Sequence, residues 1–486
     1  MPYLHGIRIK ENPTSVPTPV YNEAGVPVIF GTAPVNLVAD PTGAVNKLFL
    51  CNNYAEAVEA VGYSDDYASY TLCQAIDAFF KAFAVGPVVL CNVLDPANAA
   101  HKTAITQTSA AVTDSQATLT ELGIIKSTVT LKNGNTDLEE GTDYTLAFNS
   151  EGKLVVTVLT SGITTLTVAG SKLNPSGVTA SDVVGAINNT GTKTIYTGIQ
   201  LVDKVYPTFG LTPSLLLAPG WSHISAVGLA LAGKCTDVSG MFTCECVVDI
   251  DSGQTVNGAK KYTDVETVKA NSGYAHEHMI CVWPQVKYAG LKMAFSAIYA
   301  AMACYTDCNN DNVPNLSPSN RAIRIGAAVL EDGTEILLDQ PQANTLNGIG
   351  VVTALNLNGW KAWGNNTAAY PDTTDPKDRW IACRRFFSWW GNSFITTYME
   401  KVDNPANYRL IESVVDSENV RANSLVSTGK CAGLRMVYSK EDNPIGNVID
   451  GKIVFRQYLA PYTPAEDILN VLEFDPDMIE AALGGE

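Results

Sequence analysis

Short apolar runs alternate with helical stretches along most of this chain, and one long segment without a helix pattern interrupts them. The runs VPVIFGTAP from Val26 and GPVVLCNVLD from Gly86 flank the helical stretch YASYTLCQAIDAFFKAF. The alternation returns beyond residue 213 with SLLLAP, FTCECVVDID and HMICVWPQV. Strands that alternate with helices build a largely parallel sheet covered by helices. We therefore expect an α/β (mixed α+β) multidomain fold.

The interrupting segment, residues 101–175, is rich in Thr, Val, Ser and Gly. Its alternating runs STVTLKNG, DYTLAFN, KLVVTVLT and TTLTVAG are joined by turn signals. This pattern predicts a small β-sandwich, immunoglobulin-like, inserted into an α/β domain that closes around it. The expected divisions are an N-terminal arm (1–20), an α/β domain (21–100 and 176–356), the inserted sandwich (101–175), a C-terminal domain (357–464) and a C-terminal arm (465–486).

Charge and hydrophobicity narrow the function classes. The 486 residues include 49 acidic and 32 basic side chains, a net charge of −17, which repels a phosphate backbone. We expect neither nucleic-acid binding nor membrane insertion, since no stretch approaches the ~20 apolar residues that span a bilayer. The N-terminus shows no signal peptide, and eleven cysteines in apolar contexts indicate reduced thiols without disulfides in a cytoplasmic product.

Both ends of the chain carry strand-like patterns that have no partner nearby in the sequence. Tyr3, Ile7 and Ile9 share one parity before a proline-rich tether, and the run DILNVLEFD places apolar side chains on both parities. Such lone strands are stable only when they join another sheet. Strand addition to a neighbour in a head-to-tail contact builds a helical filament. We therefore interpret these side chains as inter-subunit contacts: Tyr3, Ile7, Ile9, Ile468, Leu469, Val471, Leu472 and Phe474.

One segment imitates a nucleotide-binding loop. GLALAGKC, from Gly228 to Cys235, fits G-x-x-x-x-G-K but ends in Cys where magnesium binding requires Ser or Thr. Apolar residues run through it at helical spacing, so a helix already engages its amides. We expect an ordinary buried helix with Lys234 near its C-terminal end.

Several pairs of potential metal ligands also occur, but none has a second cluster at metal-site spacing. His276 and His278 lie two apart on an expected strand. A calcium loop at Asp307 and Asp311 lacks its glycine and terminal glutamate. We predict no catalytic, cofactor or metal site. The remaining pairs are Cys244 with Cys246 and Cys304 with Cys308.

Aromatic residues concentrate late in the chain, where five of the seven tryptophans fall within about thirty residues. The helical spacing of Trp380, Phe387 and Trp390 favours a helix that packs inward. Tryptophan and arginine also anchor protein interfaces, and that alternative stays open. Core packing is the preferred interpretation for each tryptophan.

The segment TLNGIGVVTALNLNGWKAWGNNT, from Thr345, resembles the signature of contractile phage tail sheath proteins. The similarity extends to LLLAPGWS at 215–222, NLSPSNRAI at 315–323, RWIACRRFF at 379–387 and the opening MPYLHGIRI. It covers nearly the whole chain apart from the inserted sandwich, which is similar to one in the myophage-like branch. In this resemblance Gly359, Trp360, Trp363, Gly364 and Thr367 form a framework motif.

The resemblance implies a structural protein without cofactors. Subunits would polymerise helically, in stacked hexameric rings, around a tail tube, and would contract to drive the tube through a cell envelope. The implied partners are further copies, the tube protein, and baseplate and terminator proteins, in a virion tail or a headless bacteriocin-like tail assembled in the host cytoplasm. The alternatives are a surface-binding sandwich and a nucleotide-binding enzyme.

A cluster of basic residues near the expected tryptophan helix offers a further contact. Lys377, Arg379, Arg384 and Arg385 stand against one acid residue, Asp378, in a strongly acidic chain. We predict that this cluster faces an acidic tube surface. The alternative is that the arginines pair with carboxylates of the same chain.

Overall fold

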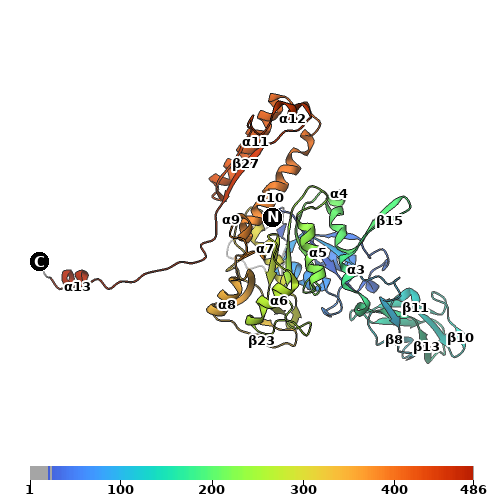
Figure 1. The fold of residues 1–486 in the computed structure, drawn as a ribbon. Coiled ribbons are helices and arrows are strands. Elements are labelled where there is room, and N and C mark those ends of the chain that lie inside the picture. The colour runs from blue at the N-terminus through green and yellow to red at the C-terminus, as the bar shows by residue number, and fades with distance from the viewer. Residues whose placement is uncertain (1–19, 22–23, 485–486) are drawn as a thin grey trace, which may run out of the picture.

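The computed structural model describes residues 20–21 and 24–484. A central body carries three projections: the inserted β unit, a C-terminal helical lobe and a long C-terminal arm (Figure 1). The expected strand residues Tyr3, Ile7 and Ile9 lie outside the described residues. The fold is mixed α/β, as the sequence predicts.

An eight-stranded sheet forms the centre of the body, in the order β25-β24-β19-β18-β17-β2-β5-β3. Its inner neighbours pair in parallel, whereas β3 and β25 close the two edges antiparallel. Strands β2, β5 and β18 are buried along their whole length because helices cover both faces. The strands span β2 Val26–Gly31, β3 Leu48–Cys51, β5 Val88–Asn92, β17 Pro213–Leu217, β18 Glu245–Asp249, β19 Met279–Val282, β24 Val351–Asn356 and β25 Trp360–Trp363.

Local capping explains where several body helices begin. The Asn53 side chain accepts a hydrogen bond from the Glu56 amide at the start of α1. Asp339 and Gln342 form a capping box at the start of α8. The helices of the body are α1 Tyr54–Val61, α2 Leu72–Ile76, the π-helix η2 Asp77–Phe83, α3 Ala180–Val184, α4 Val205–Phe209, α5 Ser225–Cys235, α6 Val265–Ser272, α7 Phe295–Cys308 and α8 Gln340–Asn347.

Smaller sheets and short 3-10 turns complete the body. A four-stranded sheet has the order β21-β20-β22-β23, and two further pairs are β1 with β4 and β15 with β16. The strands span β1 Val20–Tyr21, β4 Val85–Gly86, β15 Ile187–Thr190, β16 Lys193–Tyr196, β20 Gln285–Tyr288, β21 Leu291–Met293, β22 Ala327–Val329 and β23 Glu335–Ile336. The 3-10 turns are η1 Val35–Leu37, η4 Pro175–Gly177, η5 Gly198–Lys204 and η6 Tyr262–Asp264.

The inserted β unit hangs from the body on a two-stranded stem, in which Lys102 of β6 pairs with Leu173 of β14. Beyond the stem, two sheets of orders β10-β9-β13-β7 and β11-β12-β8 enclose a separate apolar core. Burial alternates along β12 and β13, because one face of each strand meets that core. The elements are β6 Lys102–Ala104, β7 Ser109–Ala111, β8 Gln116–Thr118, η3 Lys126–Thr128, β9 Thr130–Asn133, β10 Thr136–Asp137, β11 Tyr144–Phe148, β12 Leu154–Val158, β13 Thr165–Ala169 and β14 Ser171–Leu173.

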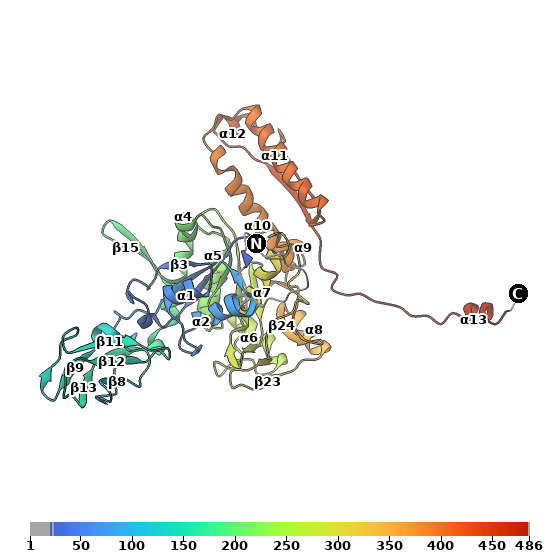
Figure 2. The same ribbon diagram turned by 180° about the vertical axis from the view of Figure 1, so that it is seen from behind.

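The C-terminal lobe is built from two long helices that run out of the body together (Figures 1 and 2). Helix α11 was missed by the sequence analysis, although Ile411, Val414 and Ala422 are its buried face. The lobe packs around Phe386, Trp390 and other apolar residues. Its elements are α9 Pro376–Arg379, α10 Ile381–Tyr398, η7 Met399–Lys401, α11 Tyr408–Ser427, β26 Cys431–Val437, α12 Ile445–Ile449 and β27 Arg456–Pro461.

Two expectations about this half of the chain are wrong. Residues 357–363 do not open a separate region, because β25 pairs with β24 at the edge of the central sheet. The C-terminal lobe therefore starts after them. His276 and His278 lie in the irregular segment and turn that precede β19 and not on a strand. The other domain limits stay predictions.

The C-terminal arm leaves the body after β27 and extends far from it (Figure 1). Residues 462–475 form neither helix nor strand, and α13, Pro476–Ala482, follows them. The expected strand from Ile468 to Phe474 is therefore not formed within one subunit. A strand needs a partner for its main-chain groups, and none lies beside the arm among the described residues.

Candidate assembly surfaces

The framework motif begins in the β24–β25 hairpin. Asn358 and Gly359 take positive φ angles of 53° and 116° in its turn, a conformation that suits these residue types. Trp360 and Trp363 are partly buried against the main core, and the Trp360 indole donates to the Gly326 carbonyl at 3.1 Å. Both tryptophans therefore brace the sheet edge, in line with the preferred packing interpretation.

The rest of the motif joins the sheet to the start of the lobe. Gly364 has a φ of 142°, and a Cβ there would lie 2.7 Å from the Asn347 side chain. The Thr367 hydroxyl donates to the Asp378 carbonyl at 2.6 Å, and its amide donates to the Arg379 carbonyl at 2.8 Å. The motif thus fixes α9 against the body.

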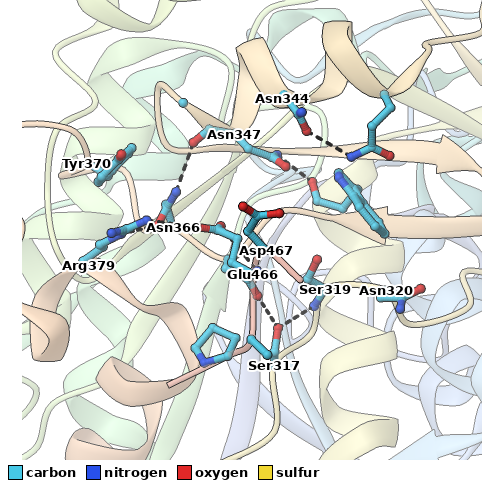
Figure 3. A pocket seen from close by; sticks show the side chains of 16 residues that line it. Ser317, Ser319, Asn320, Asn344, Asn347, Asn366, Tyr370, Arg379, Glu466 and Asp467 are labelled. Carbon is cyan, nitrogen blue, oxygen red and sulfur yellow. Dashed lines mark hydrogen bonds and ion pairs between the residues drawn. The ribbon is translucent and has the colours of Figure 1, made fainter. Parts of the chain in front are cut away.

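A polar cleft of about 780 Å³ lies beside this motif (Figure 3). Amide and hydroxyl side chains of α8, the motif and residues 317–320 line most of it. The first residues of the C-terminal arm, Pro464 to Asp467, form its remaining wall. The cleft is therefore the place where the arm's root meets the body.

Arg379 holds the centre of this contact. Its Nε donates to Asn366 at 3.0 Å, and one terminal nitrogen donates to Glu466 at 3.0 Å. The guanidinium also lies over the rings of Trp380 and Tyr370, at 4.0 and 4.6 Å from the ring centres. The Asn365 side chain contacts the same Glu466 carboxylate at 3.5 Å.

The basic cluster predicted to face a tube is largely neutralised within the chain. Arg384 donates to Asp378 at 3.0 Å, and Lys377 lies 2.9 Å from the same carboxyl group. Burial alone would raise the pKa of Asp378, but the two cations lower it overall. These pairs leave Lys377, with 39% of its side chain exposed, as the most accessible cation of the cluster.

Arg385 contradicts the tube-facing prediction. Its side chain is 5% exposed and forms a two-fold hydrogen-bonded ion pair with the buried Asp307 of α7. Burial raises the pKa of Asp307, which Arg385 partly offsets. The guanidinium is therefore engaged inside the subunit, and Asp307 serves this pair in place of a calcium loop.

The predicted C-terminal contact residues are strongly exposed. Between 67 and 86% of the surface of Ile468, Leu469, Val471, Leu472 and Phe474 is open to solvent. Residues 462–486 also contain seven acidic side chains and no Lys or Arg. An exposed apolar stretch of this size marks an interaction surface, and its charge favours a basic partner.

The sheet of the C-terminal lobe is a second incomplete element. It has only two strands, β26 and β27, and neither outer edge pairs with another strand among the described residues. Two cations lie on it: Arg435 stacks over Tyr458 at 4.8 Å, and Arg456 is exposed beside Asp442. On the outer edge of β26, the Asn419 side chain of α11 already donates to the Met436 carbonyl and accepts from the Met436 amide. The outer edge of β27 has no such contact among the described residues, and an edge of that kind accepts an additional strand.

The segment that imitates a nucleotide-binding loop forms helix α5, as expected. A Cβ on Gly228 would lie 2.2 Å from the Tyr274 hydroxyl, so this glycine serves close helix packing. Lys234 is paired with Asp203 at 2.7 Å. The segment has no open loop in which its amides could hold phosphate groups.

The paired metal-ligand candidates differ in burial. His276 and Cys308 are partly exposed and Asp311 is exposed, whereas the remaining candidates are buried: His278, Cys244, Cys246, Cys304 and Asp307. His278 contacts the Cys244 carbonyl at 2.9 Å through Nδ1, while Cys281 is buried in β19. Burial raises the pKa of Cys281 to about 12. Within residues 24–484, no three His, Cys, Asp or Glu side chains gather closely enough to hold a metal ion.

In the described part of the chain, no helix has the length and hydrophobicity needed to cross a bilayer.

A smaller cavity of about 190 Å³ lies at the carboxyl ends of β17 and β18. His223 lines it, and its buried Nδ1 makes no hydrogen bond to any described residue. Burial lowers the pKa of His223 more than nearby Asp251, Asp249 and Glu331 raise it. The pKa of His223 is therefore lower in the folded subunit than in the unfolded chain, so the unfolded chain binds this proton more readily.

We expect acidification to destabilise the subunit through His223. Because its folded-state pKa is lowered, its contribution is complete above the unfolded value of about 6.5 and is lost as the pH falls below it. Urea unfolding at pH 7.5 and 5.5 should show a larger loss of unfolding free energy in wild type than in His223→Asn. Equal losses in the two proteins would contradict this role.

Two features of the site are not indicated by any local sequence pattern, one buried and one exposed. Lys269 is 7% exposed and donates to the carbonyls of Ile349, Ala368 and Tyr370 at 2.6, 2.7 and 3.2 Å. Glu466 meets Arg379 across 87 residues of sequence. Neither residue lies in a local pattern, so only the tertiary fold reveals them.

The fold defined by this body, inserted unit and lobe occurs in contractile injection systems. The PVC sheath complex of an extracellular contractile injection system, in its contracted state, matches with a TM-score of 0.55 and 15% identity, covering 98% of this chain and 99% of that one. A chain of the anti-feeding prophage baseplate gives a TM-score of 0.57 at 15% identity, covering 98% and 100%.

Sequence similarity identifies the class more closely. The chain is 24% identical over 496 residues to the tail sheath protein of Burkholderia phage BcepMu, with 99% of both chains covered. No protein-family model matches it. The chain is thus similar to phage tail sheath proteins, and to that of BcepMu along almost its whole length.

Proposed function

We propose that this chain polymerises helically around a tail tube in a metastable extended state and contracts to drive the tube through a target envelope. The observation that carries this proposal is the C-terminal arm, whose large apolar side chains stay exposed although the body buries extensive cores. Only a second molecule offers those side chains an apolar environment.

The acceptor that fits the arm best is the β26–β27 sheet of another copy. The arm is acidic and extended, whereas the sheet has an unpaired edge at β27 and carries Arg435 and Arg456. Strand addition would supply directional main-chain hydrogen bonds, each worth about 0.5–1.5 kcal/mol net. The contact is head-to-tail and does not close on itself, which is the geometry that builds a helix of subunits.

The arm's length supports this link. Fourteen residues without helix or strand, 462–475, span at most roughly 46–50 Å when extended. Such a tether keeps neighbouring subunits connected while their bodies rotate, which contraction requires. The N-terminal residues Tyr3, Ile7 and Ile9 remain predicted strand contacts of the same kind.

The remaining partners follow from the sheath function. We place the tube contact near Lys377, Arg379 and Arg384, and Lys377 is the member most open to an acidic surface. The polymer would consist of stacked six-subunit rings. Baseplate and terminator proteins would lie at its two ends. Assembly would take place in the host cytoplasm, into a virion tail or a bacteriocin-like tail.

Negative-stain electron microscopy of the purified, concentrated protein tests the proposal. Uniform hollow tubes or ring fragments are the expected result. Monodisperse monomers across a range of salt and protein concentrations, with or without a tube protein, would overturn it.

The inserted β unit should be dispensable for polymerisation. Its stem strands meet at Lys102 and Leu173, so a short Gly/Ser linker can replace residues 103–173. Ile125 and Leu173, however, lie in the deleted segment and are 3% and 4% exposed in the main core, so we expect a loss of about 2–5 kcal/mol in unfolding free energy for each.

Tubes should still form from the deleted protein under the microscope. Ile125→Ala with Leu173→Ala in the full chain is the matched control, and it should reproduce most of the stability loss. A folded deletion variant that makes no tubes would show that the inserted unit supplies a lattice contact.

A further inference from the structure

We propose that the Gly364–Thr367 motif and Arg379 form a socket for the Glu466 carboxylate, which fixes the root of the C-terminal arm on its own subunit. The comparisons assign no role to this cleft. The inference rests on the proposed function only for its use in the polymer, because the contact itself lies within one chain.

Several contacts orient the Arg379 side chain for binding a carboxylate. Stacking on Trp380 and the hydrogen bond to Asn366 orient the guanidinium, so little side-chain freedom remains to be lost on binding. The Asn366 side chain is itself anchored, because it donates to the Asn347 carbonyl at 3.1 Å. One guanidinium edge is left to face the arm, where it meets Glu466.

The second wall of the socket comes from Asn365. Its amide nitrogen faces the Glu466 carboxylate, and its oxygen accepts from the Ser317 hydroxyl at 2.5 Å. Figure 3 shows Glu466 between Arg379 and Ser317, with the arm crossing the cleft. Two adjacent asparagines of the motif thus act on the Glu466 carboxylate. Asn365 contacts it directly, and Asn366 orients Arg379, which binds it.

The backbone of the motif holds the two walls of the socket in place. Gly364 lets the backbone pass Asn347 and Val352 where a Cβ would collide, and Thr367 ties the backbone of Arg379 to the motif. Changes at these positions would move both walls of the socket. In a polymer, force on the arm would reach the body at this fixed point.

Without the Arg379–Glu466 contact, electrostatic repulsion disfavours a position of the arm close to its own body. The arm carries seven acidic side chains in a chain of net charge −17, so general electrostatics repel it. The Arg379–Glu466 pair is the one ion pair between the arm and the rest of the described chain. Its side chains are 24% and 35% exposed, which limits screening without excluding water.

Pulsed electron paramagnetic resonance on the isolated subunit tests the socket. Nitroxide-bearing amino acids at Ser424 and Asn470 report the distance between the lobe and the arm. Glu466→Gln should broaden the distance distribution and lower the ratio of docked to released arms about two- to five-fold, as for a partly exposed ion pair. Arg379→Gln should act in the same direction, with no further effect of the double variant.

Asp467→Asn is the matched control, since it removes the same charge one residue further along the cleft. It should leave the distribution unchanged, and all variants should keep the wild-type melting temperature. The exchanged pair Arg379→Glu with Glu466→Arg should narrow the distribution relative to either single change. An unchanged distribution in Glu466→Gln, or equal broadening in Asp467→Asn, would overturn the proposal. These distances need no polymer, so absence of tubes would count against the sheath mechanism and not against the socket.

Discussion

Replacing Leu472 and Phe474 with asparagine is expected to abolish tube formation while the subunit keeps its melting temperature. The two side chains are 86% and 82% exposed, so the isolated subunit loses no buried contact. If the arm links subunits as proposed, each side chain buries against a neighbour in the polymer, and its replacement costs about 1.5–3 kcal/mol. Summed over every subunit contact, that loss is large enough to decide whether a lattice forms.

Electron microscopy and thermal unfolding on the same preparations check this result. Leu472→Val with Phe474→Leu is the control, because it keeps apolar side chains at both positions and should still assemble. If the asparagine variant made normal tubes, the arm could not be the link between subunits. A melting temperature far below wild type would show that these residues already support the subunit's own fold.

Arg385→Met is expected to destabilise the subunit by about 3–5 kcal/mol, because it leaves the Asp307 carboxylate buried without its partner. Denaturant unfolding measures the loss. The double change Asp307→Leu with Arg385→Met removes both charges and should recover most of it. The experiment therefore determines the coupling free energy between Asp307 and Arg385 in the stability of the subunit.

This result would separate the two interpretations of the basic cluster. A stable, folded Arg385→Met subunit that fails to assemble around a tube would restore the tube-facing role for this residue. Arg384→Glu offers a comparison, since its partner Asp378 is only partly buried and the loss should be smaller. Lys377 remains the best candidate for an outside contact.

The parts of the fold that could be predicted are those with strong local patterns. The buried runs at Val26, Val88 and Glu245 became parallel strands because continuous apolar stretches fit only a sheet covered on both faces. The alternating segments of residues 101–175 also became strands. Helix α11 escaped because polar residues surround its narrow apolar stripe.

The contacts that could not be predicted from the sequence are those between residues far apart in the chain. Asp307 and Arg385 are 78 residues apart, and Glu466 lies 87 residues from Arg379. No local spacing indicates that these charges meet, so the arginines could equally be assigned to a partner. The placement of Trp360 at a sheet edge depends instead on a local hairpin with β24, for which the Asn358–Gly359 turn is a sequence signal.

Cryo-electron microscopy of assembled tubes tests the central claim most directly, by showing where residues 462–475 lie. The account predicts that they form an added strand on the β26–β27 sheet of another subunit, with Glu466 still held by Arg379 of their own. An arm folded back along its own subunit, or neighbours joined only through their bodies, would contradict it.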